Sequence, residues 1–189
     1  MQIRIANKKD AQNIRKILEK YLIDIHGSEV SKEKSNSGFL IRNITIEQIE
    51  ELILDDQNNL TIVAENDENI IGYLMATKYM ALNPEMKSGV APVLNDNQIN
   101  NLEKIIYYRQ IAVDPDVKSN GAGRLLISEL IKQAKIREYN DVVCRIVFKP
   151  IYNSRSVAFH EKCGFELIGQ ETENNLTVGV YLKKLQNNQ

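Results

Sequence analysis

The most informative stretch of the sequence is QIAVDPDVKSNGAGR, residues 110–124. It has strand character as far as Val113, a proline two positions later stops the strand from simply continuing, and a helical pattern opens at Gly121. The first N–H groups of a helix have no acceptor within it, and the helix dipole adds partial positive charge there. Because Gly121 and Gly123 carry no side chain, an anion can approach this backbone closely. The stretch therefore predicts a strand–turn–helix unit whose turn binds phosphate.

Lys118 and Arg124 flank the glycines of this turn and add positive charge at its rim. The turn is not a Walker loop, because no Gly-Lys-Ser/Thr follows, and it lacks the third glycine of a dinucleotide fingerprint. A strand-to-helix turn that needs glycine only for its backbone angles is the alternative interpretation. The turn alone therefore does not identify a ligand.

Hydrophobic periodicity outside this unit predicts a single domain over residues 1–185 and a short polar tail at 186–189. The order β-α-α-β-β-β-α-β-α-β-β indicates an α+β (α/β-like) domain around one twisted sheet. We expect this sheet to be central, mixed and mostly antiparallel, with six to seven strands and about four helices on its faces. Strands are expected at residues 2–6, 60–65, 70–79, 104–113, 142–148, 165–169 and 177–183, and helices at 10–21 (capped by Asp10), 45–54, 121–139 and 154–163.

Composition argues against several classes of protein. The 189 residues are 43% hydrophobic and carry a formal net charge of −1, without the basic excess of a nucleic-acid-binding protein. No run approaches the roughly 18 apolar residues of a membrane span, and residues 1–5 have no signal-peptide core. Cys144 and Cys163 form no CxxC pair and no metal-ligand spacing with His26 or His160, so no metal is expected. We expect a cytoplasmic protein.

A second motif is NSRSVAFHEKCGF, residues 153–165. Asn153 is expected to cap a short helix by accepting a hydrogen bond from the amide of Ser156. Gly164 would end this helix, and Phe165 would make the hydrophobic contact that commonly accompanies such an ending. Without further information, the segment is simply a capped helix between two strands.

Together the two motifs resemble those of the GCN5-related N-acetyltransferase (GNAT) superfamily. Residues 118–124, Lys-x-x-Gly-x-Gly-Arg, are similar to its cofactor motif Gln/Arg-x-x-Gly-x-Gly/Ala. Residues 153–165 are similar to its pattern Asn-x-x-Ala/Ser-x-x-Leu/Phe-Tyr-x-x-x-Gly-Phe. The order and separation of the motifs also agree, and the resemblance covers nearly the whole chain. Lys118 stands where Gln or Arg is usual, and His160 where tyrosine is frequent.

This resemblance implies the GNAT fold and an N-acetyltransferase that moves an acetyl group from acetyl-CoA to a primary amine by direct attack in a ternary complex. In that fold the strand before the turn diverges from its parallel neighbour, and the pantetheine arm of CoA lies in the gap. The backbone N–H of Val113 would stabilise the oxyanion, and the amides of residues 119–124 would bind the diphosphate. The residues implied in cofactor binding are Ile111, Ala112, Val113, Lys118, Ser119, Asn120, Gly121, Ala122, Gly123, Arg124, Asn153 and Phe159.

The resemblance also points to His160 as the acid that protonates the departing thiolate, and imidazole titrates near neutrality. A general base is harder to identify. Gln110 cannot act as a base, although many relatives carry a glutamate on this strand. Glu65, at the end of a predicted strand, is a candidate base and Glu103 another, although such carboxylates are more often solvated.

The acceptor is not identified by the sequence; a small-molecule amine and a protein amino group both fit. Loops carry specificity on such scaffolds, which directs attention to residues 26–43, 80–102 and 171–175. Residues 80–102 are long for a connection inside a compact domain, which predicts a lid, a homodimer contact or disorder. Tyr107 and Tyr108 line the acceptor pocket or pack in the core.

Two other classes of protein fit part of the sequence. A non-catalytic acyl-CoA-binding or sensor domain of the same fold would explain the missing glutamate before the turn. A nucleotide-phosphate binder would use the glycine turn, but it leaves residues 153–165 unexplained. Transfer of an acyl group longer than acetyl is a variant of the main hypothesis.

Overall fold

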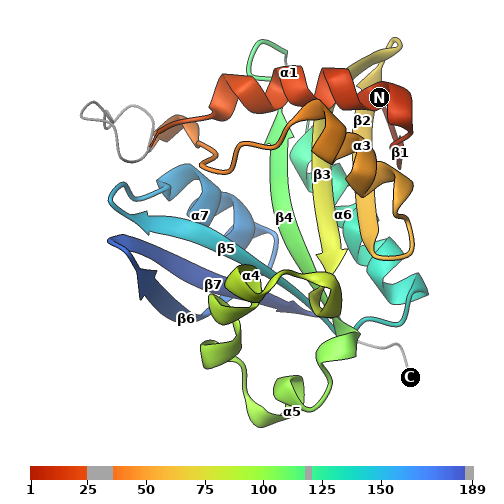
Figure 1. Cartoon of the computed structure of the whole chain (residues 1–189). Helices are drawn as coiled ribbons and strands as arrows, with labels where there is room; N and C mark the ends of the chain where they lie inside the picture. Colours follow the sequence, from red (N-terminus) through yellow and green to blue (C-terminus); the bar gives the residue numbers. More distant parts are fainter. Residues whose placement is uncertain (25–35, 118–120, 186–189) are drawn as a thin grey trace.

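The computed structural model describes residues 1–24, 36–117 and 121–185. At its centre is a seven-stranded sheet in the order β1-β2-β3-β4-β5-β7-β6 (Figure 1). Neighbouring strands are antiparallel except for β4 and β5, which confirms the predicted mixed, mostly antiparallel sheet. The strands are β1 (Gln2–Ile5), β2 (Asn59–Asn66), β3 (Asn69–Lys78), β4 (Ile105–Val113), β5 (Asp141–Lys149), β6 (Glu166–Glu173) and β7 (Leu176–Lys184).

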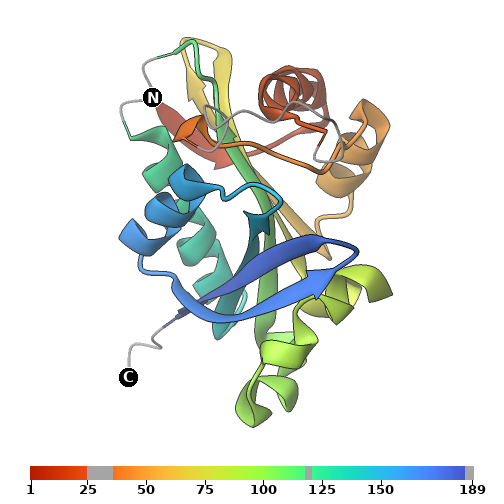
Figure 2. The ribbon, with the colours of Figure 1, turned by 90° about the vertical axis from the view of Figure 1, so that its left-hand side faces the viewer.

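Helices cover both faces of this sheet (Figure 2). On one face α1 (Ala11–Tyr21) packs beside α3 (Ile46–Leu54), and on the other lie α6 (Ala122–Ile136) and α7 (Ser154–Lys162). Two short helices, α4 (Pro84–Ser88) and α5 (Asp96–Ile99), raise the number in the described residues to six, where about four were predicted. Short 3₁₀ helices occupy Lys8–Asp10, Tyr79–Ala81, Ala91–Val93 and Leu102–Lys104.

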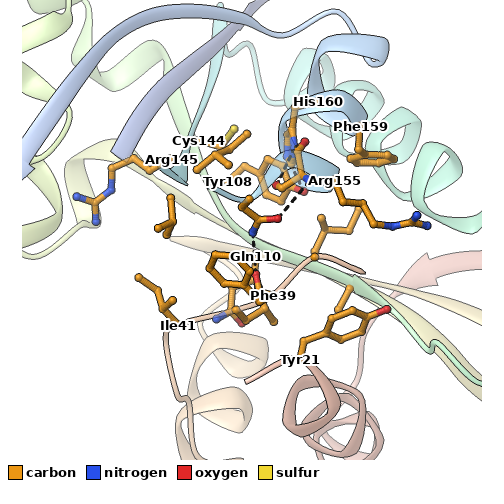
Figure 3. A pocket seen from close by; sticks show the side chains of 18 of the residues that line it. Tyr21, Phe39, Ile41, Tyr108, Gln110, Cys144, Arg145, Arg155, Phe159 and His160 are labelled. Atoms are coloured by element: carbon orange, nitrogen blue, oxygen red, sulfur yellow. Dashed lines mark hydrogen bonds between the residues drawn. The ribbon is translucent and has the colours of Figure 1, made fainter. Parts of the chain in front are cut away.

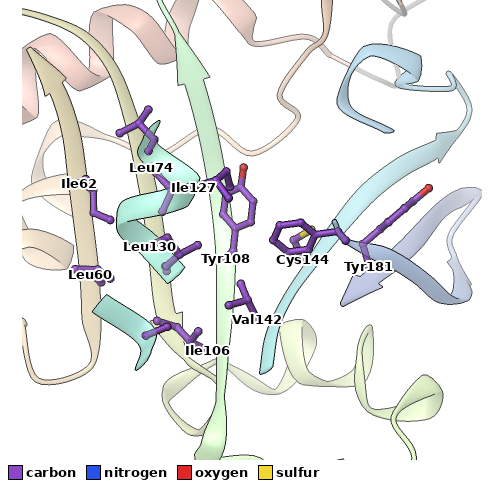
Figure 4. Close-up of a cluster of buried hydrophobic side chains, with 14 of the residues drawn as sticks. Leu60, Ile62, Leu74, Ile106, Tyr108, Ile127, Leu130, Val142, Cys144 and Tyr181 are labelled. Carbon is purple, nitrogen blue, oxygen red and sulfur yellow. The ribbon is translucent and has the colours of Figure 1, made fainter. Parts of the chain in front are cut away.

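Apolar residues alternate along the strands and so build a core on each face of the sheet. On β2, Leu60, Ile62 and Ala64 belong to the core under α6, whereas Val63 belongs to the core under α1 and α3. The larger core also includes Tyr108 of β4 (Figure 4). Full burial of one large apolar side chain contributes roughly 1.5–3 kcal/mol. The two cores therefore hold β4, which carries much of the functional site, from both sides.

The ends of two helices test the predicted caps. The side chain of Asn153 accepts a 3.3 Å hydrogen bond from the amide of Ser156, which confirms the predicted cap of α7. The prediction that Asp10 caps the first helix is wrong, because a 3₁₀ turn precedes α1 and Asn7 caps that turn. Asp10 instead accepts a hydrogen bond from the amide of Asn7.

The parallel pair β4 and β5 is joined only where the two strands begin. Residues 105–107 pair with residues 141–143, and the strands are unpaired with each other beyond that point. Figure 1 shows them separating toward α1 and α7. The divergence implied by the family resemblance is therefore present.

Residues 80–102 form a packed cover at one end of the sheet, so the prediction of disorder is wrong for this segment. Asn83 and Asn95 cap α4 and α5 with their side chains. The apolar residues of the cover pack against β4, β5 and β7 and are buried there: Leu82, Met86, Val90 and Leu94, with Tyr107, Val143, Val180 and Leu182 beneath them. A contact between two copies of the chain through this segment stays a prediction. Among the helices of the described ranges, none is long and apolar enough to cross a membrane.

Candidate functional site

A cleft of about 1100 Å³ opens where β4 and β5 diverge (Figure 3). Besides these two strands, its walls include residues 36–43, the start of α4, the start of α6, and α7. Basic side chains line both ends: Arg124, Arg155 and Lys162 from α6 and α7, and Arg42, Arg109 and Arg145 nearer to α4. Of the predicted cofactor-binding residues, those that line the cleft are Ile111, Ala112, Val113, Gly121, Gly123, Arg124, Asn153 and Phe159.

The backbone of β4 presents hydrogen-bonding groups to this cleft. The amide of Asp114 donates to the carbonyl of Ile71 on β3, with an N···O distance of 2.8 Å. Because adjacent residues of a strand point their N–H and C=O groups to opposite sides, Val113 and Ile111 direct theirs away from β3. The carbonyl of Val113 accepts a 2.6 Å hydrogen bond from the hydroxyl of Tyr21. These strand groups are thus placed to bind an extended ligand in the gap.

The first turn of α6 has the backbone geometry on which the predicted anion site depends. Gly121 has a φ of +87°, which favours glycine, and no atom lies within 4 Å of the position that a Cβ would take there. Its carbonyl accepts from the amides of Arg124 and Leu125. The amides of Ala122 and Gly123 precede these donors and so have no acceptor in the helix. The side chain of Ala122 is buried in the core, so only its amide can take part. The predicted binding residues Lys118, Ser119 and Asn120 lie outside the described residues, as do residues 26–35 of the first specificity loop and the 186–189 tail.

Gly123 has a second role that the sequence did not reveal. A Cβ at this position would lie 3.2 Å from two ring atoms of Phe159 on α7. Glycine therefore lets α6 and α7 pack closely, in addition to leaving room for a ligand. Asn153 is also structural, because it caps α7 and donates a 3.1 Å hydrogen bond to the carbonyl of Phe39, which holds residues 36–43 against the cleft.

His160 of α7 and Tyr108 of β4 form a hydrogen-bonded pair on the inner wall of the cleft (Figure 3). His160 Nε2 lies 3.2 Å from the Tyr108 hydroxyl, and Nδ1 lies 2.7 Å from the carbonyl oxygen of Ser156. Since a carbonyl can only accept, Nδ1 carries the hydrogen of the neutral ring. Nε2 then accepts from the phenol.

The prediction that His160 titrates near neutrality is wrong. Its side chain is only 4% exposed, and burial lowers its pKa to about 4, despite the opposing hydrogen bond to Ser156. Burial also raises the pKa of Tyr108 well above its ordinary value. Near neutral pH the pair consists of an uncharged imidazole and an uncharged phenol, and the N–H of the imidazole is already bonded to backbone.

Glu65, the candidate base, does not line the cleft, so that prediction is wrong. It lies on β2, two strands away from β4 in the sheet, and it forms an ion pair with Arg4. Glu103 does not line the cleft either. Sequence position could not reveal this, because the order of strands in the sheet determines which strand ends meet at the gap.

A β-bulge on β4 shapes the other end of the cleft. Met75 pairs with Gln110 and Ala76 with Tyr108, so Arg109 is an extra residue without a partner on β3. Such a bulge re-aims neighbouring side chains. Arg109 and Gln110 consequently point to the same face of the sheet.

Contacts confirm this placement. Arg109 donates to the hydroxyl of Thr77, and the amide group of Gln110 donates to the carbonyl of Arg42 at 2.9 Å. Together with Arg145 of β5, the arginines form a basic end that the sequence analysis missed. No sequence motif marks this basic end. Strict alternation along β4 would place Gln110 on the opposite face of the sheet from Arg109, so the sequence pattern hides their common face.

The sequence matches the family model described as the acetyltransferase (GNAT) family over residues 28–165. The chain belongs to the GNAT acetyltransferase family. The resemblance inferred from the two motifs is thereby confirmed. No curated protein sequence matches the chain.

Solved structures show the same GNAT fold at low sequence identity. Protein smu.2055 from Streptococcus mutans UA159 superposes with a TM-score of 0.68 at 19% identity, covering 98% of this chain and 100% of that one. The yncA structure from Salmonella typhimurium, which contains its cofactor acetyl-CoA, has a TM-score of 0.67 at 18% identity, covering 100% and 96%. Ribosomal-protein-alanine N-acetyltransferase from Brucella melitensis has a TM-score of 0.66 at 18% identity, covering 98% and 100%.

The contact between Gly123 and Phe159 gives a first prediction for this GNAT chain. Gly123→Val should weaken acetyl-CoA binding and lower the free energy of unfolding by about 1–3 kcal/mol, because the new side chain presses on the ring. Calorimetry and chemical denaturation measure the two effects. Adding Phe159→Leu relieves the contact and should restore stability but not affinity. Wild-type affinity in Gly123→Val would show that the diphosphate does not approach this residue.

Proposed function

We propose that this protein transfers an acetyl group from acetyl-CoA to a primary amine by direct attack within a ternary complex. The observation that carries the proposal is the divergence of β4 from β5 directly beside the first turn of α6. A simple phosphate binder needs that turn, but it does not need an open strand edge leading into a cleft. Acetyl-CoA in the similar yncA structure supports the choice of donor.

The residues present suit a CoA thioester. The amides of Ala122 and Gly123 fit the diphosphate, and Arg124 lies close to them at the start of α6. The backbone groups of Ile111 that face away from β3, together with the second lone pair of the Val113 carbonyl, fit the amides of the pantetheine arm. We assign the remaining predicted contacts, including those of residues 118–120, to the same ligand.

The reaction needs one bond made and one broken. The amine nitrogen attacks the thioester carbonyl carbon, the C–S bond breaks, the thiolate gains a proton and the amine loses one. We assign the backbone N–H of Val113 to the oxyanion, where a fixed donor stabilises the developing charge. We assign the proton for the thiolate to the Tyr108 hydroxyl, which His160 holds in place and which regains a proton from water to complete the cycle. This revises the assignment of His160 itself as the acid.

Within residues 1–24, 36–117 and 121–185, no dedicated carboxylate is placed to receive the proton lost by the amine. Glu85 is the only carboxylate among the described lining residues, and it is exposed on the first turn of α4. We propose that water takes the proton. The nearby guanidinium groups of Arg42 and Arg109 favour this loss, because positive charge lowers the pKa of an ammonium group.

Turnover measurements test the proposal. Release of CoA thiol from acetyl-CoA should depend on an added amine, in a panel that includes neutral, cationic and carboxylate-bearing amines. Acetyl-CoA should also bind by calorimetry, and ATP should compete poorly. Tight binding without amine-dependent thiol release would instead support the non-catalytic CoA-binding domain. Equal competition by ATP would support a nucleotide-phosphate binder.

A further inference from the structure

Three arginines gather at the end of the cleft beneath α4. Arg42 precedes α3, Arg109 is the bulge residue of β4, and Arg145 lies in the middle of β5. All three line the cleft, yet none forms an ion pair with a carboxylate of the described residues. Glu85 is the only described carboxylate in the lining. This end of the cleft therefore carries excess positive charge.

The side-chain hydrogen-bond acceptors of these arginines are all uncharged: the hydroxyls of Thr77 and Tyr107 and the thioether of Met86. The thioether sulfur of Met86 accepts from Arg42 at 2.9 Å and from Arg109 at 3.6 Å. A thioether is a weak, uncharged acceptor, so two guanidinium groups share one neutral atom. Nε of Arg109 is buried and has no partner in the described part of the chain. Burial, together with the charge of Arg42, lowers the pKa of Arg109.

Arg145 extends this basic group toward the cover segment. Its Nε donates a 3.2 Å hydrogen bond to the hydroxyl of Tyr107. The guanidinium lies against Gly89, where any side chain would collide with it. Figure 3 shows Arg145 at the opposite end of the cleft from Arg155 and Phe159, and Phe159 packs against Gly123 of the α6 turn. The basic group is thus separate from the predicted diphosphate site.

Unpaired cations placed side by side cost stability, and an anionic ligand would remove that cost. We propose that the acetyl acceptor is a free amino acid whose carboxylate binds between Arg42, Arg109 and Arg145. The proposal rests on the acetyl transfer proposed above and names its acceptor. Planar guanidinium groups bind carboxylates through paired N–H···O bonds. The single sulfur of Met86 cannot take the place of the two carboxylate oxygens in such a pair.

Other amines fit this charge distribution less well. A polyamine or a lysine side chain in a basic peptide would bring positive charge into a positive pocket. The N-terminal amine of a protein has no free carboxylate beside it. A free amino acid carries both groups within a few bonds, which suits a basic end close to the gap between β4 and β5.

Matched substrates test the proposal. Each standard L-amino acid is compared with its carboxamide, which keeps the amine and side chain but removes the negative charge. At least one acid should be acetylated with a kcat/KM about 10–100-fold above that of its amide, the range expected for a charge-assisted hydrogen bond. Equal rates for acids and amides, or a preference for a phosphate-bearing amine, would overturn the proposal.

Arg109→Met provides the matched variant, because methionine keeps the apolar stem and removes the charge. It should raise KM for the amino acid about 10–100-fold, leave KM for acetyl-CoA unchanged and abolish the preference for acid over amide. Its melting temperature should equal or exceed that of the wild type, since an unpaired cation is removed. Lys132→Gln, which removes a surface charge from α6, should change none of these values. Retention of the preference in Arg109→Met would overturn the proposal.

A binding measurement distinguishes failure of this inference from failure of the proposed function. Calorimetry on the CoA-loaded protein measures the affinity for each acid and amide without any reaction. Selective binding of acids without thiol release would contradict acetyl transfer and support the carboxylate site. Thiol release with neutral or cationic amines, without selective binding of acids, would support acetyl transfer and contradict the carboxylate site.

Discussion

Tyr108→Phe is expected to lower kcat for acetyl transfer by about 10²–10⁴-fold, the usual contribution of a positioned proton donor. A thiolate must gain a proton as it leaves, because thiols have a pKa near 8.5. Of the hydrogen-bonded pair on the inner wall, His160 already donates its only N–H to the Ser156 carbonyl. The phenol hydrogen is bonded to an acceptor, His160 Nε2, and in the proposed complex it would be donated to the sulfur instead. Stopped-flow or steady-state thiol release measures the effect.

Controls separate chemistry from packing. Phenylalanine keeps the ring contacts of Tyr108 with His160 and Phe165, so acetyl-CoA affinity should remain close to that of the wild type. His160→Gln keeps polar groups near the phenol and should reduce kcat less than Tyr108→Phe does. Full activity in Tyr108→Phe with a large loss in His160→Gln would restore His160 as the acid, as the sequence suggested.

Acidification is expected to remove roughly 3 kcal/mol of stability through His160 alone. The pKa of this imidazole is about 4 in the folded chain and 6.5 in an ordinary setting, and burial is the main cause of the difference. Between these values the unfolded chain binds a proton that the folded chain excludes. The stabilising contribution is therefore complete above pH 6.5 and is lost as pH falls to about 4.

A difference measurement isolates this effect from other groups. Asp10 and Asp114 also have a lowered pKa, so the wild type loses stability in acid for several reasons. Because those carboxylates are unchanged in His160→Gln, the gap in unfolding free energy between the two proteins should close from pH 6.5 to about 4. Urea denaturation at a series of pH values measures the gap. A gap that stays constant would mean that His160 is not buried as a neutral imidazole.

Much of the fold could be predicted because it depends on local patterns. The strands follow apolar alternation, and α7 begins at an asparagine whose capping role is a property of a few consecutive residues. The α6 turn is equally local, since Gly121 needs only its own φ of +87° to open the helix. The two motifs therefore indicated the GNAT family, and they also give the position of the proposed anion site.

The chemistry of the cleft depended on distant contacts instead. Neighbouring residues in the sequence do not specify that His160 meets Tyr108, 52 positions away, or that burial keeps its imidazole neutral. Strand order removed Glu65 from the gap, because β3 lies between β2 and β4.

The sequence by itself thus determined the order of elements, the glycine turn and the family, because these depend on short-range backbone geometry and side-chain periodicity. Tertiary structure alone brought Arg42, Arg109 and Arg145 together from a loop and two strands. A single bulge on β4 places Gln110 on the same face as Arg109, and no local pattern encodes it. The positive charge at the basic end of the cleft is a result of packing, because charges far apart in the chain interact only after the sheet and its cover have assembled.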